Sequence, residues 1–161
     1  MKKPKEERNL RRNSKNNKLK NCLEYLKERF GIENSIFENF CFFEKNKEIW
    51  IANEQLCRFD IKNFVRKGVR IFRIFPKGIK ITTVGIQLFG KYAKKNVYEI
   101  KSEEELKKYL RGEDLIVGEL KNIEEGQVII KYRKDFLGSG IYKNGKIKNQ
   151  LPKGRRLFLY E

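Results

Sequence analysis

The sequence contains no histidine, and this absence excludes several kinds of catalytic and metal site. Of 161 residues, none is His and three are Cys. Without His, Ser-His and Cys-His dyads cannot form, and the commonest metal ligand is missing. Cys22, Cys41 and Cys57 lie too far apart in sequence for a C-x-x-C motif. We therefore predict no metal site, and an odd, widely spaced set predicts buried free thiols in a reducing compartment.

Long apolar runs are also lacking. The longest stretch without a charged residue covers ten positions, residues 81–90. A membrane-spanning helix needs about 20 apolar residues, so this stretch is too short. The basic N-terminus is followed by "NCLEYLKERF" rather than by the apolar region of a signal peptide. We expect a cytoplasmic protein with no membrane partner.

Acidic residues are scarce relative to basic ones. The chain has 38 Lys and Arg against 21 Asp and Glu, a net charge of +17, which favours a polyanionic partner. Residues 1–20 and 127–161 each carry nine bases and two acids, whereas residues 101–126 carry five bases and eight acids. Lysine-rich composition alone explains part of the excess. A uniform bias, however, would not leave an acidic segment between two basic ones.

Enzymatic motifs are weak or missing. "GSG" at residues 138–140 lacks the third glycine and the following helix of a dinucleotide-binding loop. It is more typical of a bulge or a close backbone approach in a barrel. The acids lie mostly in Lys- and Glu-rich stretches that resemble solvated helix faces. We predict no catalytic residue, no cofactor and no enzymatic activity.

The first half of the chain predicts a mixed α/β domain. An apolar stripe at helical spacing indicates a helix that ends at Gly31. Residues 40–52 predict a hairpin, Asn53 caps a short helix through Cys57, and residues 68–75 predict a half-exposed strand with a turn at 76–78. The stripe consists of Leu19, Cys22, Leu23, Leu26 and Phe30.

Residues 81–93 allow two interpretations. Val84, Ile86 and Leu88 alternate as in a strand. Alternatively, Thr83 caps a helix that carries Val84, Leu88 and Tyr92 on one face. Periodicity alone does not decide between them.

The second half predicts a small β-barrel. Ser102 and Glu105 form a capping-box pattern before a helix that buries Tyr109. The short β segments "DLIVGEL", "QVIIKY", "FLGSGIYK", "KIKNQL" and "RRLFLY" follow, separated by glycines. The fold class is therefore α+β, with a basic flexible arm over residues 1–16, an α/β domain over 17–94 and a barrel over 95–161.

The Asn144-Gly145 pair is the most specific local feature. Such a two-residue turn fixes the pairing of the flanking strands. It predicts the pairs Lys143 with Lys146, Tyr142 with Ile147 and Ile141 with Lys148. Three rigidly held lysines on one face suit a phosphate backbone, although lysines on a sheet edge also deter aggregation. The predicted RNA contacts are Lys131, Arg133, Lys143, Lys146, Lys148, Lys153, Arg155 and Arg156.

These segments resemble known RNA-binding families. "GQVIIKYRKDFLGSGIYKNGKIKN" is similar to the strand pair of PUA domains, in which a valine-rich strand leads into a Leu-Gly-x-Gly turn. "GKIKNQLPKGRR" resembles the PUA-like tail of RNA 5-methylcytosine methyltransferases of the NOL/NOP/Sun group. "ITTVGIQLFGKYAKKNVYEI" resembles the junction in Nip-type ribosome biogenesis factors, where a pre-PUA domain precedes a PUA domain; this favours the helical interpretation of residues 83–93.

The resemblance implies RNA binding without catalysis. The expected partner is ribosomal RNA or a pre-ribosomal particle during ribosome biogenesis. The methyltransferase tail implies an alternative, an accessory subunit that targets a separate RNA-modifying enzyme. Other assembly factors are further possible partners under either interpretation.

Overall fold

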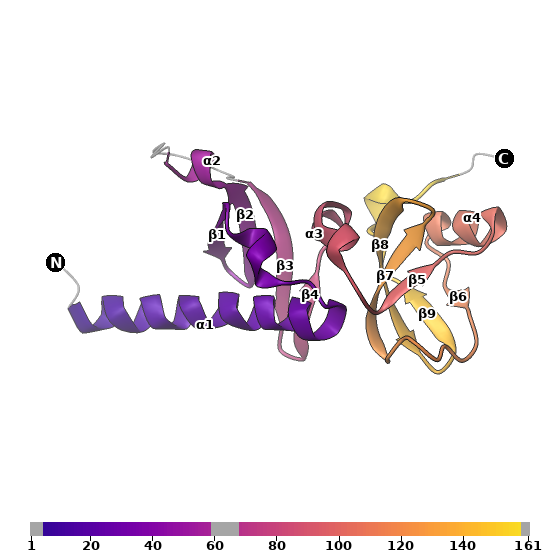
Figure 1. The fold of residues 1–161 in the computed structure, drawn as a ribbon, viewed down its shortest axis with the longest axis horizontal. Helices are drawn as coiled ribbons and strands as arrows, with labels where there is room; N and C mark the ends of the chain where they lie inside the picture. Colours follow the sequence, from indigo (N-terminus) through magenta and orange to yellow (C-terminus); the bar gives the residue numbers. More distant parts are fainter. Residues whose placement is uncertain (1–4, 59–67, 159–161) are drawn as a thin grey trace.

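The computed structural model describes residues 5–58 and 68–158, with side chains from residue 17 onward. The architecture is α+β, as predicted: an antiparallel four-stranded sheet with helices precedes a five-stranded sheet curled like half a barrel. Figure 1 shows the two sheets in opposite halves of the molecule, with α3 (Thr83–Phe89) between them. No helix of the described part of the chain is long and apolar enough to cross a membrane.

Helix α1 (Lys5–Phe30) runs along the first sheet (Figure 1). The predicted stripe is confirmed, because Cys22, Leu26 and Phe30 are fully buried in the first core. The backbone of residues 5–16 continues this helix, whereas the sequence predicted a flexible arm that becomes helical only near its end. Lys, Arg and Glu are good helix formers, and extending an anchored helix costs far less than nucleating one.

The first sheet consists of β1 (Phe40–Lys45), β2 (Glu48–Asn53), β3 (Val69–Phe75) and β4 (Gly78–Ile81), in that order and antiparallel throughout. The 3-10 helix η1 (Asn34–Phe37) precedes it. Asn53 caps α2 (Glu54–Arg58) as predicted, since its Oδ1 accepts a bond from Leu56 N at 2.8 Å. Alternate residues such as Ile49 and Ile51 are buried, so one face of this sheet packs on α1.

Helix α3 decides the ambiguity of residues 81–93, and η2 (Gly90–Tyr92) follows it. The helical interpretation is confirmed, but the cap is Thr82, whose Oγ1 accepts a bond from Gly85 N at 3.1 Å. The predicted face was wrong. Ile86 and Phe89 are buried, whereas Leu88 is 46% and Tyr92 39% exposed. Both sheets pack against α3, and their positions determine which of its side chains are buried. Periodicity alone could not identify those side chains.

The second sheet has the order β5-β7-β8-β9-β6. Its strands are β5 (Val97–Glu99), β6 (Leu115–Ile116), β7 (Gly126–Tyr132), β8 (Asp135–Lys143) and β9 (Lys146–Asn149), with β5 parallel to β7. Helix α4 (Glu103–Arg111) is capped by Ser102 as predicted and buries Tyr109. The last predicted strand is wrong within the described residues: η3 (Lys153–Arg155) forms instead, and Leu157 N bonds to Leu110 O of α4.

The hairpin register and the glycine prediction are both confirmed. The pairs Lys143 with Lys146, Tyr142 with Ile147 and Ile141 with Lys148 are those observed. A side chain at Gly138 would collide with the Tyr109 hydroxyl, and one at Gly140 would collide with Ile147. The "GSG" glycines therefore serve close packing inside the second sheet.

The prediction of three free thiols is wrong for two of them. Cys41 and Cys57 form a disulfide, with Cα atoms 6.4 Å apart, whereas Cys22 is free and buried. Sequence spacing did not reveal the pair because β1 and α2 meet only after the first hairpin has folded.

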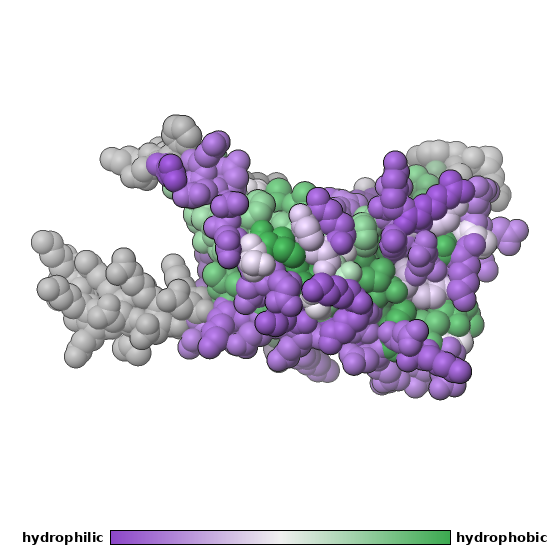
Figure 2. All heavy atoms as spheres, in the orientation of Figure 1, coloured by the Kyte–Doolittle hydropathy of each residue, from purple (hydrophilic) through white to green (hydrophobic). Residues whose placement is uncertain are grey.

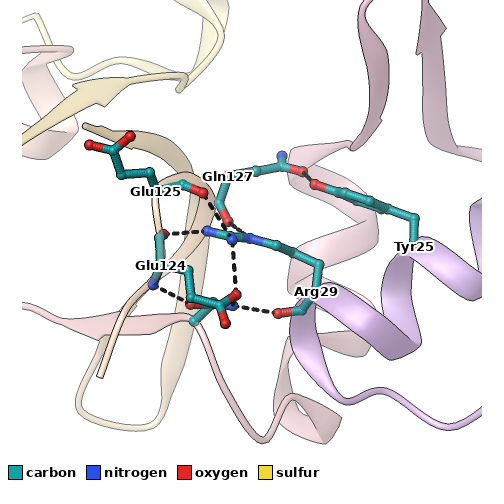
Figure 3. A network of polar contacts seen from close by, with 6 residues as sticks. Tyr25, Arg29, Glu124, Glu125 and Gln127 are labelled. Carbon is teal, nitrogen blue, oxygen red and sulfur yellow. Dashed lines mark hydrogen bonds and ion pairs between the residues drawn. The ribbon is translucent and has the colours of Figure 1, made fainter. Parts of the chain in front are cut away.

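A polar network joins the two sheets (Figure 3). The Gln127 side chain, on β7, reaches β4 of the first sheet: its Nε2 donates to Ile81 O at 2.9 Å, and Ile81 N donates to its Oε1 at 3.2 Å. The hydroxyl of Tyr25, on α1, donates to the same Oε1 at 2.7 Å. Because β4 is an edge strand, backbone groups on its outer side have no partner within the sheet. The Gln127 amide supplies hydrogen-bond partners for the N–H and C=O of Ile81.

Arg29 completes this network, which we call the clasp. Its guanidinium donates to the backbone carbonyls of Glu124, Glu125 and Gln127 at 2.6, 3.1 and 2.8 Å. Ile129 of β7 also packs into the first core. The predicted boundary near residue 95 therefore separates two sheets that share a substantial contact.

Candidate nucleic-acid interface

A basic cavity lies where the loop after η2, the loop before β7 and the β7–β8 pair meet. Its volume is about 630 Å³, and we call it the lysine cavity. Glu99 is its one acidic residue, and Tyr98 and Phe136 contribute aromatic surface. Its basic residues are Lys91, Lys94, Lys95, Lys101, Lys121 and Lys131. Such a concentration of positive charge in a concave surface attracts polyanions.

The backbone that carries these lysines is fixed. Lys94 N and Lys95 N donate to Phe30 O, at the end of α1, at 2.8 and 3.3 Å. Asn96 is 2% exposed, and its φ of 56° lies in the left-handed region. Its side chain bonds to Arg29 O at 2.7 Å and to Glu124 N at 2.9 Å. The lysines therefore extend from a backbone that needs little ordering when a ligand binds.

Two lysines of the cavity lie against aromatic rings, one in its lining and one beside it. Lys131 Nζ lies 5.6 Å from the centroid of the Phe136 ring, and Lys91 Nζ lies 5.1 Å from that of Tyr92. Gly90 permits this arrangement, because a side chain there would come within 2.8 Å of the Phe136 ring. Rings stack on bases while neighbouring cations contact phosphates, so the combination suits a nucleic acid.

The eight predicted contact residues do not form one patch. Lys131 lines the lysine cavity, and Arg133 lies at the β7–β8 turn with its Cζ 5.1 Å from the Tyr132 ring. The lysines of the Asn144-Gly145 hairpin lie at the other end of β8. Lys131 pairs with Phe136, and Lys143 lies seven residues further along β8, or ~23 Å along the strand. Figure 2 shows that hydrophilic side chains cover the lower side of the molecule from α1 to the second sheet.

The three lysines of the hairpin are not equally free to contact a phosphate. Lys143, Lys146 and Lys148 are all exposed, as predicted. Lys146 Nζ, however, forms an ion pair with Asp114 Oδ2 at 2.9 Å. The bond from Asn149 N and then that from Lys146 hold the pKa of Asp114 below its usual range. A carboxylate therefore partly neutralises one of the three lysines.

The three predicted contacts that follow β9 also lie in different surroundings. Lys153 is exposed on η3. Arg155 turns toward α3, where its Nη1 donates to Gln87 Oε1 at 2.9 Å. Arg156 is half-buried, lies against Gly112, and donates from Nε to Leu151 O at 3.0 Å. Its guanidinium thus holds residues 151–156 against the end of α4.

Sequence reasoning missed most of the lysine cavity. Of its six lysines, only Lys131 was among the predicted contacts. The run "KYAKK" at residues 91–95 was a usable signal, because it is dense in lysine and precedes a strand. Lys101 and Lys121 carried no such signal, since they lie in or beside the acidic segment and join the cavity only through the fold. Among the described residues, no group of His, Cys, Asp and Glu could hold a metal ion.

Two protein families match the chain. Residues 95–157 match the family described as "Methyltransferase RsmF PUA domain", and residues 2–62 match a "Family of unknown function (DUF7122)". The first match begins at the residue where we expected the barrel to begin. The resemblance to a methyltransferase PUA domain is thus confirmed, whereas the resemblance to Nip-type factors stays a prediction.

Several curated proteins are similar over much of the chain. The "Ribosomal RNA small subunit methyltransferase F" of Shewanella woodyi is 30% identical over 152 residues, covering 93% of this chain and 30% of the relative. The protein of that name from Shewanella piezotolerans is 28% identical over 141 residues, covering 84% and 27%. That from Aeromonas salmonicida is 28% identical over 112 residues, covering 69% and 23%.

The chain therefore spans less than a third of the length of these relatives. The similarity begins well before the PUA domain, since it covers 93% of the chain in the first case. Both sheets are thus part of what these proteins share. Residues 95–157 form a PUA domain like that of the RsmF-type rRNA methyltransferases, and the chain is a distant relative of part of those proteins.

Proposed function

We propose that this protein is a non-catalytic RNA-binding protein that binds structured ribosomal RNA during ribosome biogenesis. The observation that carries the proposal is the lysine cavity, six lysines with a single carboxylate on a rigid backbone. Most of its lining belongs to a PUA domain similar to that of proteins named as ribosomal RNA methyltransferases, and Lys91 and Lys94 precede this domain. RNA is complementary to such a surface, because it offers closely spaced negative charges together with bases that can stack.

The cavity suits folded RNA better than a flexible strand. Its lysines come from four separate segments and so present charge in a fixed three-dimensional arrangement. Double-stranded and folded RNA are recognised largely through shape and through phosphate and ribose contacts. The hairpin lysines at the other end of β8 extend the contact along the RNA.

A second function follows from the relatives. Because the matched proteins are named methyltransferases and the chain corresponds to 23–30% of their length, the chain is also suited to guide a separate RNA-modifying enzyme. An RNA 5-methylcytosine methyltransferase is the class of enzyme that the sequence resemblance indicates. In that case, the PUA domain would hold the RNA while the enzyme modifies it.

Salt-dependent binding tests the lysine cavity. The triple variant Lys95→Gln, Lys101→Gln, Lys121→Gln removes three cavity charges. The control Lys20→Gln, Lys107→Gln, Lys108→Gln removes three exposed charges outside the cavity. The slope of log K against log salt for a structured rRNA fragment should flatten by roughly 0.7–0.9 per lost contact in the first variant only. Equal effects of the two variants would show that net charge, not the cavity, binds the RNA.

A methylation assay separates the two functions. An accessory subunit should raise the rate at which a separate rRNA methyltransferase modifies its RNA, and the cavity variant should lose this effect. RNA binding without any stimulation would favour the assembly role. Methylation by the protein alone would contradict both.

A further inference from the structure

The outer face of the first sheet carries aromatic and basic side chains. The strand register aligns Phe43 of β1 with Trp50 of β2, and Trp50 with Arg70 of β3. Successive side chains of a strand point to opposite faces. Because Ile49 and Ile51 face α1 in the core, Phe43, Trp50 and Arg70 lie on the face that α1 does not cover.

The same face is strongly basic. Alternation from Trp50 places Glu48 there, and the register adds the residues paired with it, Lys45 of β1 and Arg73 of β3. Lys80 of β4 pairs with Arg73 and so lies on the same face. Arg73 Cζ and Lys80 Nζ lie 5.3 and 5.2 Å from the centroid of the Phe75 ring, which puts this third aromatic residue on the face. Of the strand residues that alternate onto this face, only Glu48 is acidic.

A hollow on this face is lined by the first sheet, by the start of α3 and by the segment after β9. Its volume is about 620 Å³, and its lining includes Trp50, Arg70 and Lys45 of the first sheet. Pro152 and Arg155, which follow β9, line it as well. Arg155 was predicted to contact RNA, and the structure directs it to this hollow rather than to the hairpin lysines.

Glu48 orients two residues of the hollow and offsets part of its positive charge, because it forms an ion pair with Arg70. Its carboxylate accepts bonds from Arg70 Nη1 at 2.6 Å and from Trp50 Nε1 at 3.3 Å. Burial alone would raise the pKa of Glu48, but the hydrogen bond and charge of Arg70 hold it below its usual value. The indole is thus held by its N–H edge, which orients the ring for stacking.

We propose that this outer face binds a single-stranded RNA segment, with one base stacked on Trp50 and backbone phosphates on Lys45, Arg70 and Arg155. Four-stranded sheets whose aromatic side chains stack bases are a recurring solution for unpaired RNA. Stacking accepts any base, and the surrounding cations supply the complementary charge. A base must be unpaired to stack in this way, so the occupant is a single strand that adjoins the structured RNA.

This inference rests on the proposed RNA binding, but its test is separate. Trp50 is the chain's one tryptophan, so intrinsic fluorescence reports on this site alone. The protein is titrated with a fluorescein-labelled ten-nucleotide oligouridine and with a blunt RNA hairpin, and both tryptophan emission and label anisotropy are followed. Oligouridine should quench Trp50 saturably, and the hairpin should bind with little quenching.

Variants identify the residues responsible. Trp50→Leu should weaken oligouridine binding by about 5- to 150-fold, the loss of one stacked base. Arg155 lines the hollow but lies outside the first sheet. Arg155→Gln should therefore weaken oligouridine binding without altering that sheet. Lys107→Gln, on α4, is a matched charge control and should leave the affinity unchanged.

The possible outcomes separate this inference from the proposed function. Hairpin binding with no quenching by oligouridine, and with unchanged affinity in Trp50→Leu and Arg155→Gln, would overturn the sheet site and leave the lysine cavity standing. Loss of hairpin binding in the cavity variant, with quenching retained, would support both sites. If neither RNA binds, both proposals are wrong.

Discussion

Replacing Gln127 by Met should strongly destabilise the protein by breaking the clasp. The substitution keeps the length of the side chain but removes its amide. Three hydrogen bonds are lost at once, those to Tyr25 Oη, Ile81 N and Ile81 O. Gln127 is 5% exposed and Ile81 2%, so water cannot readily replace the amide at these positions.

The magnitude follows from the groups left without partners. A buried polar group that loses its hydrogen bond costs about 1–3 kcal/mol. Ile81 loses a partner for both its N–H and its C=O, so Gln127→Met should lower the free energy of unfolding by roughly 2–6 kcal/mol. Tyr25→Phe removes only the hydroxyl bond and leaves Ile81 paired. Its expected cost is about 0.5–1.5 kcal/mol.

Urea unfolding followed by circular dichroism measures both values. The control is Gln55→Met on the exposed face of α2, where a change within about 0.5 kcal/mol is expected. A cost below about 1 kcal/mol for Gln127→Met, with an unchanged m-value, would refute the reasoning. In that case the sheets would be joined by apolar packing alone, and the edge of β4 would not need Gln127.

Three further predictions concern charge, pH and domain structure. Alanine at Lys146 and Lys148 should flatten the salt dependence of RNA binding by roughly 0.7–0.9 per lost contact, and by less at Lys146 because Asp114 already pairs with it; an unchanged slope would leave the hairpin only a solubilising role. Burial raises the pKa of the Cys22 thiol from 9.0 to about 12 and that of Tyr25 from 10.0 to about 12. The folded state therefore retains protons that the unfolded chain releases, so the urea midpoint should be constant from pH ~6 to ~9 and fall as the pH rises toward ~12; a midpoint that stays constant up to pH ~12 would contradict this. A fragment of residues 95–161 should fold by circular dichroism but with reduced stability, since it loses the clasp; a fragment that stays unfolded would show that the two sheets fold as one unit.

Local sequence signals determined the elements whose stability depends on neighbours within a few residues. Asn144-Gly145 fixed the hairpin register because both turn positions require positive φ, observed as 49° and 74°. Asn53 and Ser102 fixed two helix starts because a cap bonds to a backbone N–H three residues later. These contacts form within one segment, so no knowledge of the rest of the chain is needed.

Tertiary structure alone decided the features that join distant segments. The buried face of α3 depended on the two sheets that cover it, and the Cys41–Cys57 pair depended on the docking of α2. The lysine cavity gathers residues from positions 91 to 131, and the hollow beside Trp50 takes Arg155 from more than a hundred residues away. Charge predicted that the chain suits a polyanion such as RNA. Where those groups meet was decided by strand order and sheet packing, because long-range proximity depends on topology and leaves no periodic trace in the sequence.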